Sequence, residues 1–230
     1  MSASDTARPS GYGRGARLLS IGIASTGVVT FAYFSVASYV LGDVDYKRIS
    51  LLWSALFVTV TVIYRPVEQL LSRTIAERRA RGLESGHPLR TPLTIQAGFA
   101  AIALVAAFVL RGPITDDVFD GEDALFGVMV AAVLFYAASY FARGWLAGHT
   151  WFGLYGALVF MEATSRLLFA VAVAIGIASG QDVVAFGMAA APFVSLVVVP
   201  AAFARQRREG DARLAAGPEI AELDAAQQGP

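Results

Sequence analysis

No cysteine occurs among the 230 residues, so disulfides and cysteine-ligated metal or haem are excluded. Charge is also scarce, because only 16% of the residues are charged whereas a soluble domain has about 25%. Basic and acidic side chains balance at 18 each, so no overall field attracts nucleic acid or an acidic partner. Hydrophobic residues make up 56% of the chain, more than one small globule can bury. These figures indicate a membrane protein.

Signatures of catalysis are equally sparse. The two histidines, His87 and His149, have no His-x-x-x-His or Glu-x-x-His pattern nearby, so we expect no metal site. The chain has no Walker lysine loop, no dinucleotide fingerprint and no Gly-x-Ser-x-Gly turn. We therefore expect a protein that is not an enzyme and that uses no cofactor.

Long apolar runs are what the chain does contain. Six runs approach the roughly 20 residues that a helix needs to cross a bilayer core. They cover residues 18–41, 51–71, 93–110, 124–142, 151–178 and 183–204. Alternation with a period of two, as in a half-buried strand, is absent. The sequence predicts an all-α bundle of six transmembrane helices over residues 18–204, with a polar segment before it (1–17) and a flexible polar tail after it (205–230).

The basic residues between these runs fall mostly on one side. Thirteen arginines share that side: Arg8, Arg14, Arg17, Arg73, Arg78, Arg79, Arg81, Arg90, Arg143, Arg205, Arg207, Arg208 and Arg213. The other side has Lys47, Arg48 and Arg111, together with an acidic segment over residues 111–123. Because cytoplasmic loops carry an excess of lysine and arginine, this bias predicts a cytoplasmic membrane protein with both termini in the cytoplasm.

Four charged residues fall inside the apolar runs. The second run contains Arg65 and Glu68, and the fifth contains Glu162 and Arg166. A charge at the centre of a membrane helix costs about 2.5–3.5 kcal/mol on insertion scales, so such residues normally face a bundle interior or a water-filled cavity. These positions are therefore the candidate site.

Two interpretations of these charges remain open. Glu162 and Arg166 are four residues apart on one helix, so they can form an internal salt bridge that only makes the helix tolerable in lipid. Alternatively, they and Arg65 line a water-filled hollow and bind an anionic head group, since guanidinium forks suit phosphate. Glu68 lies close enough to the inner interface for water to reach it.

A set of residues spread over the predicted spans forms a familiar pattern. It consists of the block from Arg143 to Gly148 and of Tyr39, Gly42, Tyr46, Arg65, Pro66, Gln69, Phe152, Tyr155, Gly156, Glu162 and Arg166. This pattern resembles the polysaccharide flippases of the multidrug/oligosaccharidyl-lipid/polysaccharide exporter superfamily, and the block from Arg143 is similar to the region around their fourth and fifth helices. The resemblance covers roughly residues 15–205.

The resemblance implies a transporter that moves an undecaprenyl-pyrophosphate-linked glycan between the leaflets of the cytoplasmic membrane. It makes Arg65, Arg143 and Arg166 candidates for contacting the pyrophosphate or its glycan, although Arg143 is equally well a loop residue at the inner mouth. It makes Glu162 the candidate for coupling to an ion gradient, and Glu68 a further candidate for an ion pair or coupling role.

Family members have 12 or 14 helices, whereas this chain has six predicted spans. It therefore resembles the first of two lobes, which requires a second lobe from homodimerisation or from another chain. A truncated reading frame is the alternative. Two other functions stay open, a non-transporting scaffold or assembly subunit for polysaccharide synthesis and a small-molecule exporter of the same superfamily. Membrane lipid is an expected partner in every case, and nucleic acid is not.

Overall fold

The computed structural model describes residues 12–82 and 89–215, and within these ranges all regular secondary structure is helical. Six helical stretches of the described chain are long and apolar enough to cross a membrane. The predicted all-α bundle with six spans is thereby confirmed. The predictions made for residues 1–11, for His87 and for the end of the polar tail lie outside the described residues.

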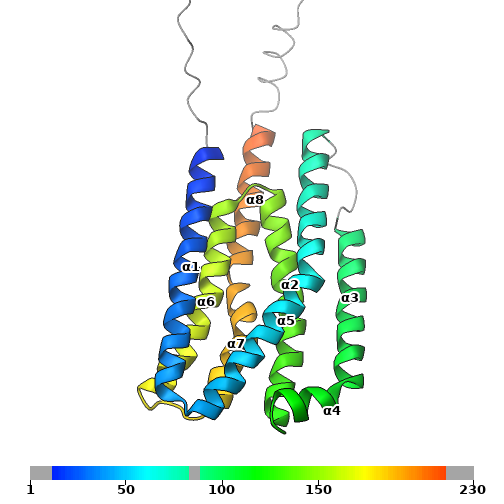
Figure 1. Cartoon of the computed structure of the whole chain (residues 1–230). Helices are drawn as coiled ribbons and strands as arrows, with labels where there is room; N and C mark the ends of the chain where they lie inside the picture. The colour runs from blue at the N-terminus through cyan, green and yellow to red at the C-terminus, as the bar shows by residue number, and fades with distance from the viewer. Residues whose placement is uncertain (1–11, 83–88, 216–230) are drawn as a thin grey trace, which may run out of the picture. The chain divides into compact units, whose positions relative to one another are not determined.

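The helices form two units that divide between Leu196 and Val197, with α8 in the second unit (Figure 1). The elements of the first unit are α1 (Tyr12–Val40), α2 (Asp43–Ala80), α3 (Arg90–Val109), α4 (Arg111–Pro113), the π-helical turn η1 (Ile114–Val118), α5 (Asp123–Gly148), α6 (Phe152–Ala174) and α7 (Gln181–Ser195). The second unit contains α8 (Val198–Ala215).

Helix α2 is far longer than the predicted span 51–71. Its 38 residues reach about 57 Å at the rise of an α-helix, against about 30 Å for a bilayer core. Acidic residues in its first turn and basic residues in its last turn complement the helix dipole and extend the helix beyond its apolar part. Figure 1 shows α2 changing direction partway along, and the helix contains Pro66, which cannot donate a hydrogen bond to the preceding turn.

One further predicted boundary is wrong. The fourth span was expected to end at Ala142, but α5 continues to Gly148, so Arg143 is a helical residue and not part of a loop. The predicted sixth span, residues 183–204, matches the apolar stretch Gln181–Arg205, in which α7 ends at Ser195 and α8 begins at Val198. Pro200 therefore falls in the first turn of α8, where its missing N–H has no intrahelical partner to lose. Helix α8 also continues to Ala215, so it includes the first eleven residues of the predicted tail.

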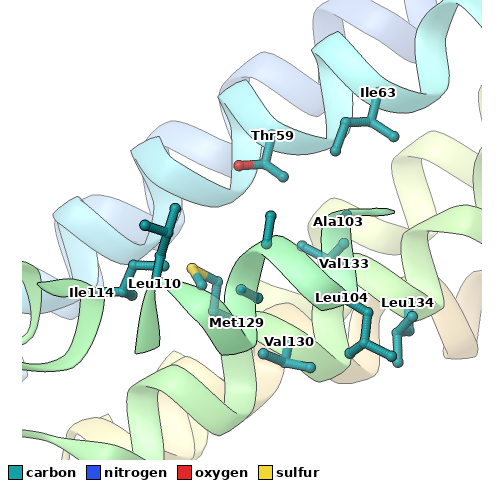
Figure 2. Close-up of a pocket in the computed structure, with 12 residues that line it drawn as sticks. Thr59, Ile63, Ala103, Leu104, Leu110, Ile114, Met129, Val130, Val133 and Leu134 are labelled. Carbon is teal, nitrogen blue, oxygen red and sulfur yellow. The ribbon is translucent and has the colours of Figure 1, made fainter. Parts of the chain in front are cut away.

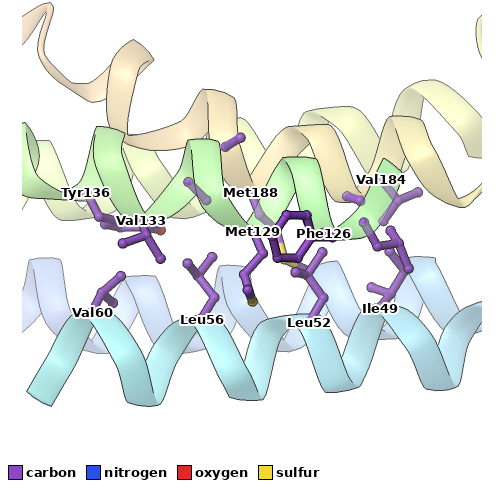
Figure 3. Close-up of a cluster of buried hydrophobic side chains, with 14 of the residues drawn as sticks. Ile49, Leu52, Leu56, Val60, Phe126, Met129, Val133, Tyr136, Val184 and Met188 are labelled. Atoms are coloured by element: carbon purple, nitrogen blue, oxygen red, sulfur yellow. The ribbon is translucent and has the colours of Figure 1, made fainter. Parts of the chain in front are cut away.

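Within the first unit, α5, α6 and α7 pack on one another, α1 lies along α6, and α2 lies along α5. Helix α3 lies at the edge, beside α2 and α5 (Figure 1). Buried residues of α2 recur every three or four positions and point at α5 and α7, as Figure 3 shows for Ile49, Leu52, Leu56 and Val60. This spacing places one face of α2 in the core.

Glycines bring α5 unusually close to α2. A Cβ atom on Gly144 would lie 2.8 Å from the backbone oxygen of Glu68, and one on Gly148 would lie 2.7 Å from Cβ of Ile75. A similar approach joins α1 to α6, where a Cβ on Gly22 would lie 3.0 Å from Cα of Gly156. Small residues allow such contacts in membranes, where van der Waals packing rather than the hydrophobic effect holds helices together. The contact of α5 with α2 fixes the position of Glu68 beside the site described next.

Candidate functional site

Glu162 is the centre of a buried polar network. It lies near the middle of α6 and is only 2% exposed. Its carboxylate accepts hydrogen bonds from the guanidinium of Arg143 and from the hydroxyl of Ser139, both on α5. The Ser195 hydroxyl of α7 lies 3.3 Å from the same carboxylate. The carboxylate thus links α6 to α5 and lies beside α7.

Ser195 has two acceptors for a single proton. Its hydroxyl lies 2.8 Å from the backbone carbonyl of Pro192 as well as 3.3 Å from Glu162. A serine hydroxyl donates one hydrogen bond, so it serves one of these acceptors at a time. The shorter distance favours Pro192, which leaves Arg143 and Ser139 as the main donors to Glu162.

Arg166 does not pair with Glu162 as its spacing predicted. Its guanidinium donates to the hydroxyl of Tyr136 on α5, at 2.7 Å, and its Cζ lies 4.6 Å from the ring centroid of Trp53 on α2. The carboxylate of Glu162 is directed to α5 instead. The spacing rule failed because it considers one helix alone, whereas both side chains find better-placed partners on neighbouring helices.

Arg143 is 9% exposed, so the expectation of a loop residue at the inner mouth is wrong. Besides binding Glu162, the Arg143 guanidinium contacts the ring of Tyr140, and its Cζ lies 4.5 Å from the ring centroid. The Nε atoms of Arg143 and of Arg166 are buried without a hydrogen-bond partner. Arg143 and Arg166 are therefore held mainly by neighbours within the bundle and not by an open hollow.

Glu68 connects this network to α2. Its carboxylate accepts a hydrogen bond of 2.8 Å from the hydroxyl of Tyr155 on α6. It also interacts electrostatically with Arg143 and Arg65. Glu68 thus interacts with both the buried Arg143 and the exposed Arg65. Together with Arg143 and Arg166, Glu68 and Glu162 give the site two positive and two negative charges.

Arg65 belongs to a polar face of α2, which we call the α2 polar stripe, and Arg65 and Ser54 are the exposed members of this stripe. At 100° per residue, its members fall within about 60° of one another around the helix. They are Ser50, Ser54, Thr61, Arg65, Glu68 and Ser72, and none of them is buried. Ser50 and Ser54 donate to carbonyls one turn earlier on their own helix, which satisfies those hydroxyls without an external partner. Arg65 is the exposed charged member of the stripe.

The described part of the chain has no cluster of histidine and carboxylate side chains that could hold a metal ion. A cavity of about 200 Å³ lies between α2, α3 and α5, and its lining includes none of the five candidate residues (Figure 2). The candidate residues therefore form two sets, the buried network of Arg143, Glu162 and Arg166 and the exposed Arg65, with Glu68 between them.

Several partners in the network were not predicted from the sequence. Ser139, Ser195, Tyr136 and Tyr155 supply hydroxyl groups to its charges, and Trp53 supplies a ring face. Hydroxyl residues within apolar runs were the available signal, because a buried charge requires hydrogen-bond partners. Which hydroxyl serves which charge depends on helix neighbours that the sequence does not state.

Comparison with known proteins yields no match to a family model, to a curated protein or to a solved structure.

Proposed function

We propose that this chain is one half of a membrane transporter that moves a lipid-linked polysaccharide precursor across the cytoplasmic membrane. The family resemblance of the sequence and the α2 polar stripe support this proposal. In this orientation both termini lie in the cytoplasm, as the distribution of arginines favours. A second half, from another copy or another chain, completes the pathway.

Arg65 is the observation that carries the proposal. It is exposed on α2, about 12 Å along the helix from Arg73 and about 26 Å from Arg48. A guanidinium facing lipid at this depth is costly, whereas one facing water or a second half is not. The α2 polar stripe is therefore the face that lines the pathway, and Arg65 is its contact for the anionic pyrophosphate.

The buried network has a different role in this proposal. Arg143 and Arg166 are already hydrogen-bonded within the bundle, so they reach a substrate only after Glu162 or Tyr136 releases them. The carboxylate of Glu162 is the counter-charge that holds Arg143, so Glu162 is the candidate for coupling to an ion gradient. Glu68, a member of the α2 polar stripe, interacts with both Arg143 and Arg65 and so connects the buried charges with the stripe.

Replacement of Arg65 tests the assignment. We expect Arg65→Ala to reduce export of surface polysaccharide about tenfold or more, since a charge-assisted hydrogen bond contributes about 1.5–3 kcal/mol. Arg65→Lys should retain more activity, because it keeps the charge and loses only the fork geometry. The matched control is Arg73→Ala, which removes an exposed arginine two turns away on the same helix. Normal export by correctly inserted Arg65→Ala would contradict the role of Arg65.

A non-transporting assembly subunit is the second candidate, and the capped arginines favour it. Because Arg143 and Arg166 have partners within the bundle, the network is also compatible with a purely structural role. In that case Arg65→Ala leaves export unchanged, whereas changes in the cytoplasmic segment around Arg78–Arg81 disrupt it. The two candidates thus predict opposite results for Arg65→Ala.

A further inference from the structure

The cavity between α2, α3 and α5 is lined almost entirely by aliphatic side chains (Figure 2). Thr59 and Ile63 line it from α2, small residues such as Ala103 and Ala107 from α3, and Met129 and Val133 from α5. The Thr59 hydroxyl is the one polar side-chain group among the lining residues. Water needs two to four polar partners to occupy a cavity, so this one excludes it.

The surroundings of the cavity are apolar as well. Outside the cavity, α3 exposes large apolar side chains such as Phe99, Ile102 and Val105, as a helix in contact with lipid does. The cavity has a volume of about 200 Å³. A dry apolar cavity of about 150 Å³ already holds a benzene molecule, so a stretch of hydrocarbon chain fits here.

One end of the cavity lies at a charged rim. Leu110 and Ile114 line that end, and between them Arg111 has a side chain that is 55% exposed and pairs with Asp123 at 3.0 Å. Ala103 lies about 10 Å deeper along α3. A lipid whose chain enters here therefore comes from the leaflet on the side of residues 111–123 and has its head group at this rim.

The charges of the rim select the head group. Residues 111–123 carry one arginine and five carboxylates: Asp116, Asp117, Asp120, Glu122 and Asp123. Arg48 of α2 pairs with Asp120 and Glu122, and Arg111 pairs with Asp123, so the excess of negative charge comes from the exposed Asp116 and Asp117. An anionic head group is repelled by this excess of negative charge, whereas a zwitterionic one offers a phosphate to Arg111 and an ammonium to the carboxylates. We propose that the cavity between α2, α3 and α5 binds an acyl chain of a zwitterionic phospholipid from that leaflet. This site does not depend on the proposed transport function.

Photo-crosslinking of the purified full chain tests the site. The probe is phosphatidylethanolamine with a diazirine midway along one acyl chain, titrated in detergent, and cross-linked peptides are located by mass spectrometry. We expect saturable labelling within residues 103–110 and 129–134. Ala107→Phe fills the cavity, and its matched control Ile102→Phe places the same ring on the exposed side of α3. Ala107→Phe should weaken labelling about tenfold, as expected when about two methylene groups lose their burial.

Each other outcome overturns the proposal. Equal labelling of Ala107→Phe and Ile102→Phe means that only unspecific surrounding lipid was captured. Competition on the unaltered protein gives a test that does not depend on how a variant folds. Unlabelled phosphatidylethanolamine should displace the probe better than phosphatidylglycerol or a polyprenyl phosphate does. Stronger displacement by phosphatidylglycerol contradicts the head-group assignment, and stronger displacement by polyprenyl phosphate contradicts the acyl-chain assignment.

Discussion

At the scale of single residues, the energetic cost of the buried charges depends on their partners. Glu162 and Arg143 lie on different helices, and both are nearly inaccessible. Taking two charges out of water is expensive, and an ion pair offsets this cost only while both partners are present. The pair therefore makes the packing of α5 against α6 sensitive to either side chain.

Replacement of Glu162 should expose this sensitivity. We expect Glu162→Gln to lower the free energy of unfolding by about 3–5 kcal/mol, because it leaves Arg143 buried without a counter-charge. Reversible unfolding in mixed detergent micelles measures the change. Glu77→Gln, which breaks an exposed pair with Arg73, is the control and should have little effect.

A double variant separates charge from packing. Combining Glu162→Leu with Arg143→Met removes both charges together and should recover most of the lost stability, since apolar replacements of a buried pair are often neutral. Equal destabilisation by the double and the single variants would contradict this account of the pair.

The sequence identified the ionic residues inside the spans but not their contacts. Arg65, Glu68, Glu162 and Arg166 stand out because charge is rare in apolar runs. Arg143 was misplaced because hydropathy declines after Ala142, although the helix continues for six more residues. Pairings across helices depend on which faces meet, and spacing along one helix contains no such information.

At the scale of helices, glycines set how closely α5 approaches α2. Gly144 and Gly148 are four residues apart, so both lie on the face of α5 that meets α2. The sequence predicted six helices well, because apolar length is a property of each segment alone. It predicted the ends of α2 and α5 poorly, because residues outside the apolar runs continue both helices. Terminal charges support the ends of α2, and packing against α2 supports the end of α5.

Adding one methyl group tests this contact. Gly144→Ala should destabilise the bundle by about 1–3 kcal/mol, because its Cβ would collide with the backbone of α2 and the two helices must separate. The same detergent unfolding measurement applies. Gly127→Ala on the same helix is the matched control, since nothing lies within 4 Å of its added Cβ. Equal effects of the two substitutions would show that the close approach is unimportant.

At the scale of the whole molecule, the proposed transport function requires a second half. In the family that the sequence resembles two lobes enclose the pathway, and under this proposal the second half, not lipid, covers the α2 polar stripe. The number of predicted spans suggested that a second half is needed. The sequence could not show whether that half is another copy of this chain or a different protein. That choice depends on surfaces that only the folded bundle presents.

The number of chains per complex tests this requirement. We expect protein extracted in native bilayer discs to contain a second copy or a second membrane chain, measured by native mass spectrometry. As a control, the protein is extracted in detergent and re-inserted into an excess of lipid. Chains that share a disc only because they were crowded in the native membrane should then separate. A single chain in every disc, from cells with normal polysaccharide export, would contradict a half-transporter.

The most direct test of the central claim uses the absence of native cysteine. Single cysteines are placed on the α2 polar stripe at Ser54, Thr61, Arg65 and Ser72, and at the exposed apolar positions Ile102 and Val105 of α3 as controls. The measurement is the rate of reaction with a membrane-impermeant maleimide in sealed membrane vesicles of each orientation. The account predicts that the stripe positions react and the α3 positions do not, because only the stripe faces a water-filled pathway. Stripe positions as unreactive as those of α3 would contradict it.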